Sequence, residues 1–340
     1  MRPDRAQRGA GRIEQQAFID IDSLLRPVYG HAKQGASYGH TKIAGKQVLR
    51  KGLSPLATTI STEHSAPVIA GMRLRAGKTG SGKGAGRMVA QAIATARAAG
   101  ATGKILVRGD SAYGNRAVVR ACVRGNAEFS LVMTKNRAIQ RAIAAIPDTA
   151  WTPVRYPGAV QDPDTGAWIS DAEVAEVPYT AFAATKDRTT ARLVVRRVTD
   201  ARYPDALFPV WRYHPFFTNT DLPTAQADII HRRHAIIETV FADLIDGPLA
   251  HLPSGHFGAN SAWALCAATA HNLLHAAGTL AGQGHAVARG ATLRRRLILV
   301  PARLARPART PVLHLPSRWP WAPTWLRLWD QAIGHSPPAA

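Results

Sequence analysis

The stretch VRGDSAYGNRAVV, residues 107–119, decides how the fold is interpreted, because it places an aspartate between a strand and a helix. A short β-branched run precedes Asp110, and a Ser-Ala-Tyr-Gly turn and then a further apolar stretch follow it. In α/β proteins, chemistry takes place at the edge of the sheet formed by the carboxyl ends of the strands. The pattern therefore predicts that Asp110 lies at such an edge, where other residues would have to join it.

Other segments of the chain are predicted as the remaining elements of a sheet of this kind. Alternating or continuous apolar runs predict strands, and apolar residues at helical spacing predict helices. By these criteria we expect strands over 17–25, 53–61, 66–75, 104–110 and 128–134, and helices over 86–100 and 115–124. Strands and helices in this order are typical of a mixed α/β sheet.

Beyond this region the texture of the sequence changes twice. Residues 151–213 are rich in Pro, Gly, aromatic residues and short β-branched runs, which predicts a β-rich insertion. Apolar residues at helical spacing then predict one long helix over 224–246. The most apolar segment, 262–277, is too short and too polar to span a bilayer, so we expect a buried core helix there.

The chain is strongly basic, with 43 Lys and Arg residues against 22 Asp and Glu residues, a net charge of +21 and a pI near 11.0. A globular chain with this balance favours a polyanionic partner, and nucleic acid is the first candidate. The charge is also uneven, because residues 247–329 contain nine arginines and no acidic residue. Blocks of this kind are commonly interaction segments.

The two cysteines and the N-terminus indicate the compartment. Cys122 and Cys266 both lie in apolar helical stretches, which predicts buried free thiols and no disulfide framework. The basic, polar N-terminal residues are followed by no apolar core, unlike a secretory signal. We therefore expect a cytoplasmic, nucleoid-associated protein with no membrane contact.

Two motifs suggest other functions, and we consider both less favoured. GKTGSGKG, residues 77–84, matches a phosphate-binding loop, but Gly84 stands where the magnesium-binding hydroxyl belongs. A Lys/Gly loop that contacts DNA phosphates is the favoured interpretation, and an NTPase with a loop of this type remains an alternative. A histidine metal site lacks zinc-site spacing; its candidate ligands would be His231, His234, His251 and His256.

The acidic residues form the most informative set. Asp20 and Asp22 share one face of the strand over 17–25, and Asp110 ends another strand. Glu238 lies on the long predicted helix, on a polar edge with His231 and His234. Hard oxygen ligands gathered at one edge would suit a two-metal site for phosphodiester chemistry, with the basic surface holding DNA.

Four stretches of the chain resemble DDE insertion-sequence transposases, and more narrowly the group 1 DDE domain of the insertion-sequence family numbered thirteen-eighty. The stretches are FIDIDSLLRPVYGHAKQGASYGHTKIAGK (18–46), GLSPLATT (52–59), LVRGDSAYG (106–114) and RRHAIIETVFADLIDGPLAHLPSGHFGANSAWALCAATAHNLL (232–274). The resemblance implies a ribonuclease-H-like mixed sheet flanked by helices and interrupted by a β-rich insertion. On this basis we expect a flexible basic N-terminus over 1–16, a catalytic domain in two parts over 17–150 and 223–284, an insertion over 151–222, and a basic C-terminal segment over 285–340.

The resemblance also implies residue roles. The family's first Asp precedes a small hydroxyl residue, which favours Asp22, before Ser23, over Asp20. The second Asp and the Glu fall on Asp110 and Glu238. This triad would be catalytic and would hold two Mg²⁺ ions, with Mn²⁺ as a substitute. A Tyr, Arg and Lys that accompany the Glu in related transposases are here His231, His234 and Ile245.

The implied function is metal-dependent DNA cleavage at the ends of a mobile element and strand transfer to target DNA, by a homodimer on DNA. We expect phosphate contacts from Lys78, Lys83, Arg87, Arg232, Arg233, Arg294, Arg295 and Arg296. Trp151, Trp168 and Trp211 could stack on an unpaired base, although the core of a small β layer is the favoured interpretation.

The N-terminus departs from the family pattern, since only about twenty residues precede the first Asp where a larger region is usual. We therefore expect an N-terminally truncated transposase. The alternative function is a catalytically inactive, DNA-binding transposase remnant.

Overall fold

The chain folds into two compact units in the computed structural model, which describes residues 13–30, 32–43, 46–63, 65–156, 172–200, 202 and 207–334. The first unit combines residues 1–23 with residues 80–237, and the second combines residues 24–79 with residues 238–340. The chain therefore crosses between the units more than once. No helix in the described part of the chain is long and apolar enough to cross a membrane.

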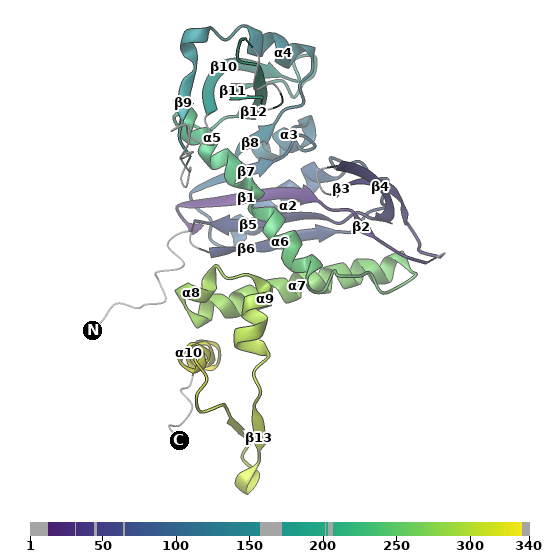
Figure 1. The fold of residues 1–340 in the computed structure, drawn as a ribbon, viewed down its shortest axis with the longest axis vertical. Helices are drawn as coiled ribbons and strands as arrows, with labels where there is room; N and C mark the ends of the chain where they lie inside the picture. The colour runs from purple at the N-terminus through teal and green to yellow at the C-terminus, as the bar shows by residue number, and fades with distance from the viewer. Residues whose placement is uncertain are drawn as a thin grey trace, which may run out of the picture. The chain divides into compact units, whose positions relative to one another are not determined.

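The first unit is built on a mixed sheet (Figure 1). Its strands, in spatial order, are β1 (Gln16–Ser23), β7 (Lys104–Gly109), β8 (Glu128–Val132), β12 (Trp211–Thr218), β11 (Thr189–Thr199), β10 (Ala172–Ala181) and β9 (Thr152–Val154). The first three pair in parallel, and the last four join in antiparallel fashion. The central strand β7 is buried from Ile105 to Gly109, as expected for a parallel strand covered on both faces.

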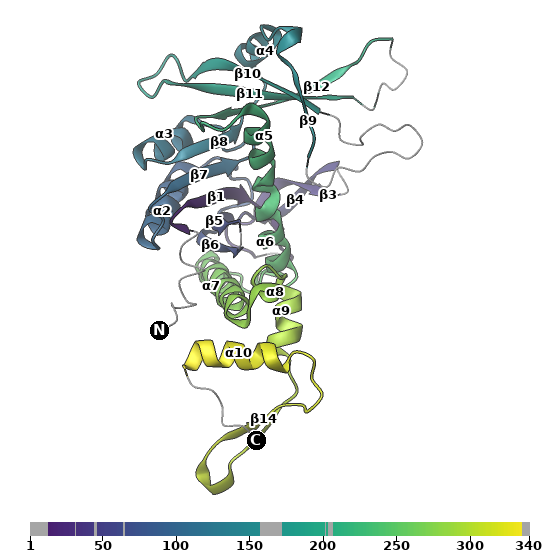
Figure 2. The ribbon, with the colours of Figure 1, turned by 90° about the vertical axis from the view of Figure 1, so that its left-hand side faces the viewer.

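Helices cover both faces of this sheet. They are α2 (Ala85–Ala98), α3 (Arg116–Arg124), α4 (Arg137–Ala144), a short 3₁₀ turn η1 (Asp148–Ala150) and α5 (Thr224–Arg232). Figure 2 shows α2 and α3 side by side on one face, with α5 across the other. Ile230 of α5 packs on Phe18 and Leu106 of the parallel strands, which fixes the helix over β1 and β7.

These elements confirm the predicted mixed sheet and most of the predicted elements to within a few residues. The segment predicted as β-rich, 151–213, contains β9, β10 and β11 and the start of β12. Its strands extend the main sheet through the pairing of β12 with β8. The segment therefore belongs to the same sheet as the parallel strands.

The second unit contains two smaller sets of strands. A three-stranded antiparallel sheet has the order β2 (Arg26–Pro27), β4 (Lys46–Leu53), β3 (Ser37–Ile43), and β5 (Leu56–Thr62) forms a hairpin with β6 (Ser65–Arg73). The two strands of the hairpin were predicted, over 53–61 and 66–75, whereas β3 and β4 were not. Their charged, Gly-containing sequence lacks a clear apolar alternation, and the large side chains of Tyr38 and Leu49 are exposed.

Helices and a terminal hairpin complete the second unit. They are α6 (Ile236–Ile245), which begins at the unit boundary, α7 (Phe257–Ala281), α8 (Gln283–Ala286), α9 (Gly290–Leu293), a π-helical turn η3 (Arg294–Ile298), β13 (Arg303–Ala305), a 3₁₀ turn η4 (Pro307–Arg309), β14 (Val312–His314) and α10 (Ala322–Ile333). The π-helical turn holds the three consecutive arginines of this segment.

The long helix α7 covers β6. Its Asn272 side chain accepts a hydrogen bond from the backbone N–H of Ile69 (2.7 Å) and donates one to the carbonyl of the same residue (2.9 Å). The predicted helix over 262–277 is confirmed, but its burial is not complete, since Leu273 is 67% exposed. Only one face of α7 is buried.

The two cysteine thiols differ in burial, because each helix that carries them buries only one of its faces. Cys122 is buried within α3, and burial raises the pKa of its thiol. Cys266 lies on the outer face of α7 and is exposed. The prediction of two buried thiols is therefore wrong for Cys266, because a uniformly apolar helical sequence does not indicate which face is covered.

Candidate active site

Asp22 and Asp110 directly follow two paired residues on the adjacent parallel strands β1 and β7. The pairing of β1 with β7 ends at Ile21 and Gly109, and each aspartate is the residue that follows. Neighbouring strands lie about 4.8 Å apart, and both residues are therefore placed at the carboxyl edge of the sheet. Asp110 is exposed and Asp22 is half-buried.

Asp20, the alternative first carboxylate, has a different environment. It is 1% exposed, and both its oxygens accept hydrogen bonds of 2.8 Å from Nε and Nη2 of Arg108. Arg108 also donates to the carbonyl of Ile230 on α5 (2.9 Å) and lies over the Phe18 ring. Burial raises the pKa of the Asp20 carboxyl, and the Arg108 guanidinium opposes that shift. Asp20 is therefore part of a buried ion pair that joins β1, β7 and α5.

Short local contacts hold the two edge aspartates. The backbone N–H of Ser23 donates to Oδ1 of Asp22 (2.6 Å), and that of Ala112 donates to Oδ1 of Asp110 (2.9 Å). The turn after Asp110 needs Gly114, because a Cβ there would lie 2.1 Å from the carbonyl oxygen of Val132. The motif around Asp110 thus combines a carboxylate with a turn that packs closely on β8.

Glu238 lies in the first turn of α6 and is exposed. It belongs to the second unit, whereas Asp22 and Asp110 belong to the first. The single helix predicted over 224–246 is wrong in one respect, because a 3₁₀ turn, η2 (Arg233–Ala235), separates α5 from α6. The tighter winding of this turn changes the helical phase, so spacing rules for one continuous helix do not apply across it.

Most of this chain matches one model of a protein family. The model described as "Transposase DDE domain group 1" matches residues 10–333. The chain belongs to this family. Membership confirms the predicted resemblance to DDE transposases, and it implies dependence on a divalent metal ion. The insertion-sequence family number and the N-terminal truncation stay predictions.

The curated proteins and the solved structures give different results for this family member. No curated protein matches it. Among solved structures, it is similar to the chain described as "Cryo-EM structure of piggyBac transposase synaptic complex with hairpin DNA (SNHP)", with 8% identity and a TM-score of 0.41. The match covers 82% of this chain and 51% of that chain, so this chain spans about half the length of the piggyBac transposase.

One of the two histidines near Glu238 in this DDE family member, His231, does not lie on the predicted polar edge. His231 is 5% exposed, stacks at 4.2 Å on Phe216 and lies 2.8 Å from Oγ of Ser130 through its Nδ1. Burial is the main cause that holds the pKa of His231 well below its usual range. His231 is therefore a buried, neutral imidazole, because α5 packs that face against β8 and β12.

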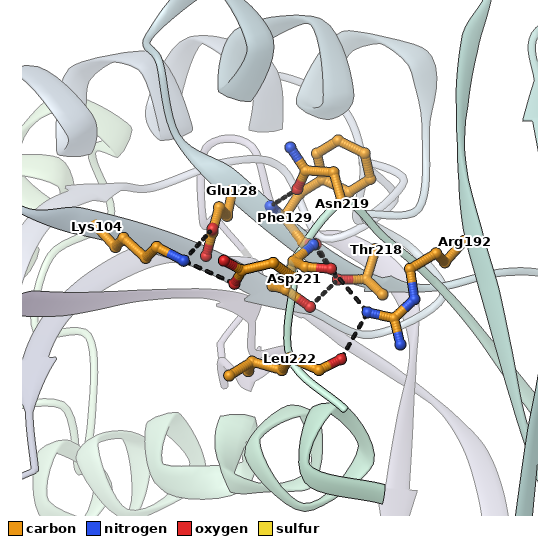
Figure 3. A network of polar contacts seen from close by, with 9 residues as sticks. Lys104, Glu128, Phe129, Arg192, Thr218, Asn219, Asp221 and Leu222 are labelled. Carbon is orange, nitrogen blue, oxygen red and sulfur yellow. Dashed lines mark hydrogen bonds and ion pairs between the residues drawn. The ribbon is translucent and has the colours of Figure 1, made fainter. Parts of the chain in front are cut away.

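The opposite end of β7 is tied down by ion pairs. Figure 3 shows Nζ of Lys104, at the start of β7, between Oε1 of Glu128 (3.3 Å) and Oδ1 of Asp221 (2.7 Å). In the same network, Arg192 donates to the carbonyl of Leu222 (2.7 Å), and the side chain of Asn219 accepts from the backbone of Phe129 (2.7 Å). These contacts fix the connection from β12 to α5.

The basic residues predicted to contact DNA fall into two groups. Lys78, Lys83, Arg87, Arg232, Arg233 and Arg295 are exposed. Arg294 and Arg296 are half-buried and have partners within the second unit: Arg294 donates to the carbonyl of Asp246 (3.3 Å), and Arg296 lies 3.8 Å over the Trp321 ring. These two guanidiniums also stabilise the second unit.

The Gly-rich segment over 77–84 consists of turns before α2. Its first glycine has a packing reason, since a Cβ on Gly77 would lie 2.2 Å from the carbonyl oxygen of Ser37 and 2.3 Å from that of Gly52. Gly84, with φ of 83°, is the N-cap residue directly before α2. Both glycines thus have structural roles that need no nucleotide.

The tryptophans of the β-rich segment surround an arginine. The guanidinium of Arg197 lies 4.3 Å from the Trp151 ring centre and 4.4 Å from that of Trp211. Arg197 also pairs with Glu173 at 2.5 Å. This arrangement supports the interpretation of Trp151 and Trp211 as part of the β layer, and Trp168 lies outside the described residues.

Sequence reasoning missed one group of potential ligands. Asp243, His271 and His275 are buried, and one ligand atom from each lies within 4.8 Å of the others. The spacing of four residues between the two histidines on a helix was the available indication. The third member comes from another helix, which no spacing rule could identify.

Proposed function

We propose that this chain is a transposase that cuts DNA at the ends of a mobile element and joins the cut strand to target DNA. The observation that carries the proposal is the placement of Asp22 and Asp110 at the carboxyl ends of two adjacent parallel strands, in a chain of the DDE transposase family. We assign these two residues and Glu238 as the catalytic carboxylates and the metal ligands.

The residues at this edge suit a hard divalent cation. Asp22 and Asp110 offer carboxylate oxygens, which Mg²⁺ prefers, and Asp110 is exposed to solvent. Asp20 is not suited to this role, because both its oxygens are bonded to Arg108 in the interior. Asp22, Asp110 and Glu238 would therefore hold two Mg²⁺ ions, with Mn²⁺ as a substitute.

The chemistry divides between the metal ions and the protein. When bound, such ions would activate the attacking oxygen and stabilise the leaving oxygen of an in-line phosphodiester exchange. Exposed Lys and Arg side chains would neutralise DNA phosphates and position the duplex without reading its sequence. The exposed candidates include Lys78, Arg87 and Arg295, and also Arg232, whose guanidinium lies 4.4 Å from the Tyr156 ring centre. A homodimer on DNA would bring two element ends together.

The test is a nicking assay on supercoiled plasmid with Mg²⁺ or Mn²⁺. We expect cleavage by the wild-type chain, and we expect Asp110→Ala to lose it while retaining DNA binding. Asp221→Ala is the matched control, since Asp221 is an exposed aspartate paired with Lys104 at the opposite end of β7. Equal cleavage by Asp110→Ala and wild type would contradict the proposal.

Glu238 needs a separate variant. Glu238→Gln retains the shape and hydrogen-bonding capacity of the side chain but removes the charge that would hold a cation. We expect it to bind DNA and to lose nicking, as Asp110→Ala does. Salt-sensitive DNA binding without cleavage by the wild-type chain, under every metal condition, would instead indicate an inactive DNA-binding remnant.

A further inference from the structure

Three potential metal ligands meet inside the second unit, and they are distinct from the proposed catalytic carboxylates. Asp243 comes from α6, and His271 and His275 come from α7. Their exposed fractions are 7%, 6% and 5%. The two histidines are four residues apart, so they lie on the same face of the helix.

The distances between these side chains are close to those between ligands of one metal ion. The ring centres of His271 and His275 are 4.2 Å apart. Nε2 of His275 lies 3.6 Å from Oδ2 of Asp243, which is too long for a hydrogen bond. Ligands about 2.0–2.1 Å from a tetrahedral ion are roughly 3.4 Å from one another, so this separation fits two ligands of one ion.

His275 has an unsatisfied polar side chain in this position. Within the described part of the chain, neither of its ring nitrogens has a hydrogen-bond partner, although both are buried. Burying a polar group without a partner costs about 1–3 kcal/mol. A cation bound to one nitrogen would satisfy it.

The surrounding contacts resemble those that orient metal ligands. Nε2 of His271 lies 3.3 Å from the carbonyl oxygen of Pro67, and ligating histidines commonly donate their second N–H to such a group. Asp243 accepts hydrogen bonds from Nε of Arg289 (2.7 Å) and from the backbone N–H of Gly290 (3.0 Å). Burial lowers the pKa of both histidines, to about 4 for His271, which keeps their imidazoles in the neutral form that binds metals.

We propose that Asp243, His271 and His275 bind a divalent transition-metal ion of the zinc class, which fastens α6 to α7 within the second unit. Two imidazole nitrogens and one carboxylate suit Zn²⁺, whereas Mg²⁺ takes oxygen ligands. The ion is structural and does not depend on the proposed transposase activity. Because α6 also carries Glu238, the site would stabilise the helix that presents this residue.

The test is Zn²⁺ binding by the full-length chain after removal of metal with a chelator. A competing chromophoric chelator reports the affinity, and the Asp110→Ala background removes the proposed catalytic site. We expect one tightly bound Zn²⁺ per chain in that background, and a loss of affinity of about 100-fold or more for His275→Gln. The matched control is His285→Gln, for which we expect no loss of affinity. His285 is also buried in the second unit, and its Nε2 has no hydrogen-bond partner among the residues that the structure describes.

Three outcomes would overturn the proposal. They are the absence of tight Zn²⁺ binding by the wild-type chain, equal losses in His275→Gln and His285→Gln, and binding that disappears with Asp110→Ala but survives His275→Gln. X-ray absorption on the Zn²⁺-loaded wild-type chain provides a readout that needs no variant. Two imidazole ligands at about 2.0 Å support the site, and an all-oxygen ligand shell overturns it.

Discussion

The carboxyl edge of β1 and β7 and the interior directly beneath it use the same residue types for opposite purposes. At the edge, Asp22 and Asp110 lie half-buried and exposed, with backbone N–H groups as hydrogen-bond donors. Beneath the edge, Asp20 is bonded through both oxygens to Arg108, and His231 is neutral and stacked on Phe216. The comparison teaches that burial and neighbouring groups, more than residue identity, decide whether a carboxylate is structural or available to a cation.

The largest effect should come from Asp22→Asn, which removes a proposed metal ligand from the edge. Loss of several kcal/mol of transition-state stabilisation corresponds to a decrease of about 10³-fold or more in the cleavage rate. Stability should change by less than about 0.5 kcal/mol, because the residue is not in the core. Rates of plasmid nicking and urea unfolding curves measure both quantities. A fully active Asp22→Asn variant would remove the proposed distinction between Asp22 and Asp20.

The interior should respond in the opposite way to Asp20→Ala. Removing one partner of a buried ion pair leaves Arg108 uncompensated, which costs about 3–5 kcal/mol of unfolding free energy. The control is Asp221→Ala, whose partner Lys104 is exposed, and it should cost at most about 1 kcal/mol. Equal effects of the two variants in urea unfolding would show that the buried pair has no special role. Replacing both members of the pair, as Asp20→Leu with Arg108→Met, should recover much of the lost stability.

The difference between Asp20 and Asp22 marks the limit of what the sequence could predict. Alternation placed both residues on one face of a strand, and the structure agrees that they are two residues apart on β1. The sequence pattern could not indicate that Arg108 would contact Asp20, because this contact depends on the register of β1 with β7. Only the resemblance to a family, through Ser23, favoured Asp22.

Other features depended on tertiary contacts in the same way. The mixed sheet, the helices α2 and α3 and the turn at Asp110 follow from local patterns, which explains why they were predicted. The burial of His231 and the exposure of Cys266 depend on which helix face is covered. The 3₁₀ turn between α5 and α6 is hidden within a continuous apolar stripe.

The buried histidine beneath the edge predicts a pH dependence of stability. Burial holds the pKa of His231 well below its usual range, whereas in the unfolded chain it titrates near about 6.5. As the pH falls through that value, the unfolded state binds a proton that the folded state does not, so the free energy of unfolding decreases. His231→Gln should reduce this slope by up to about 1.4 kcal/mol per pH unit.

Urea unfolding at about pH 7 and about pH 5.5, on either side of the unfolded pKa, measures this slope. Ser130→Ala is the control, because it removes the hydroxyl near Nδ1 but leaves the imidazole buried. It should cost about 1 kcal/mol at both pH values and keep the slope of the wild type. An unchanged slope for His231→Gln would mean that other groups account for the acid sensitivity.

The smallest effect concerns the turn that joins the edge to α3. Asn115 caps α3 by accepting hydrogen bonds from the N–H groups of Ala117 (3.1 Å) and Val118 (3.2 Å), and its Nδ2 donates to the carbonyl of Ala112 (3.0 Å). Asn136 caps α4 in the same way, with two backbone donors at 3.0 Å. The two caps differ in what they contact, because only Asn115 also bonds to the turn that follows Asp110.

Asn115→Ala and Asn136→Ala should therefore each lower the free energy of unfolding by about 1 kcal/mol, the usual cost of losing an N-cap. Cleavage should decrease only in Asn115→Ala, since the turn that holds Asp110 loses its brace to Ala112. Measuring unfolding and nicking for both variants separates the contribution of the cap to stability from its contribution to the edge. If both variants lost activity in proportion to stability, the position of Asp110 would not depend on this turn, and the edge would owe its geometry to the register of β1 with β7 alone.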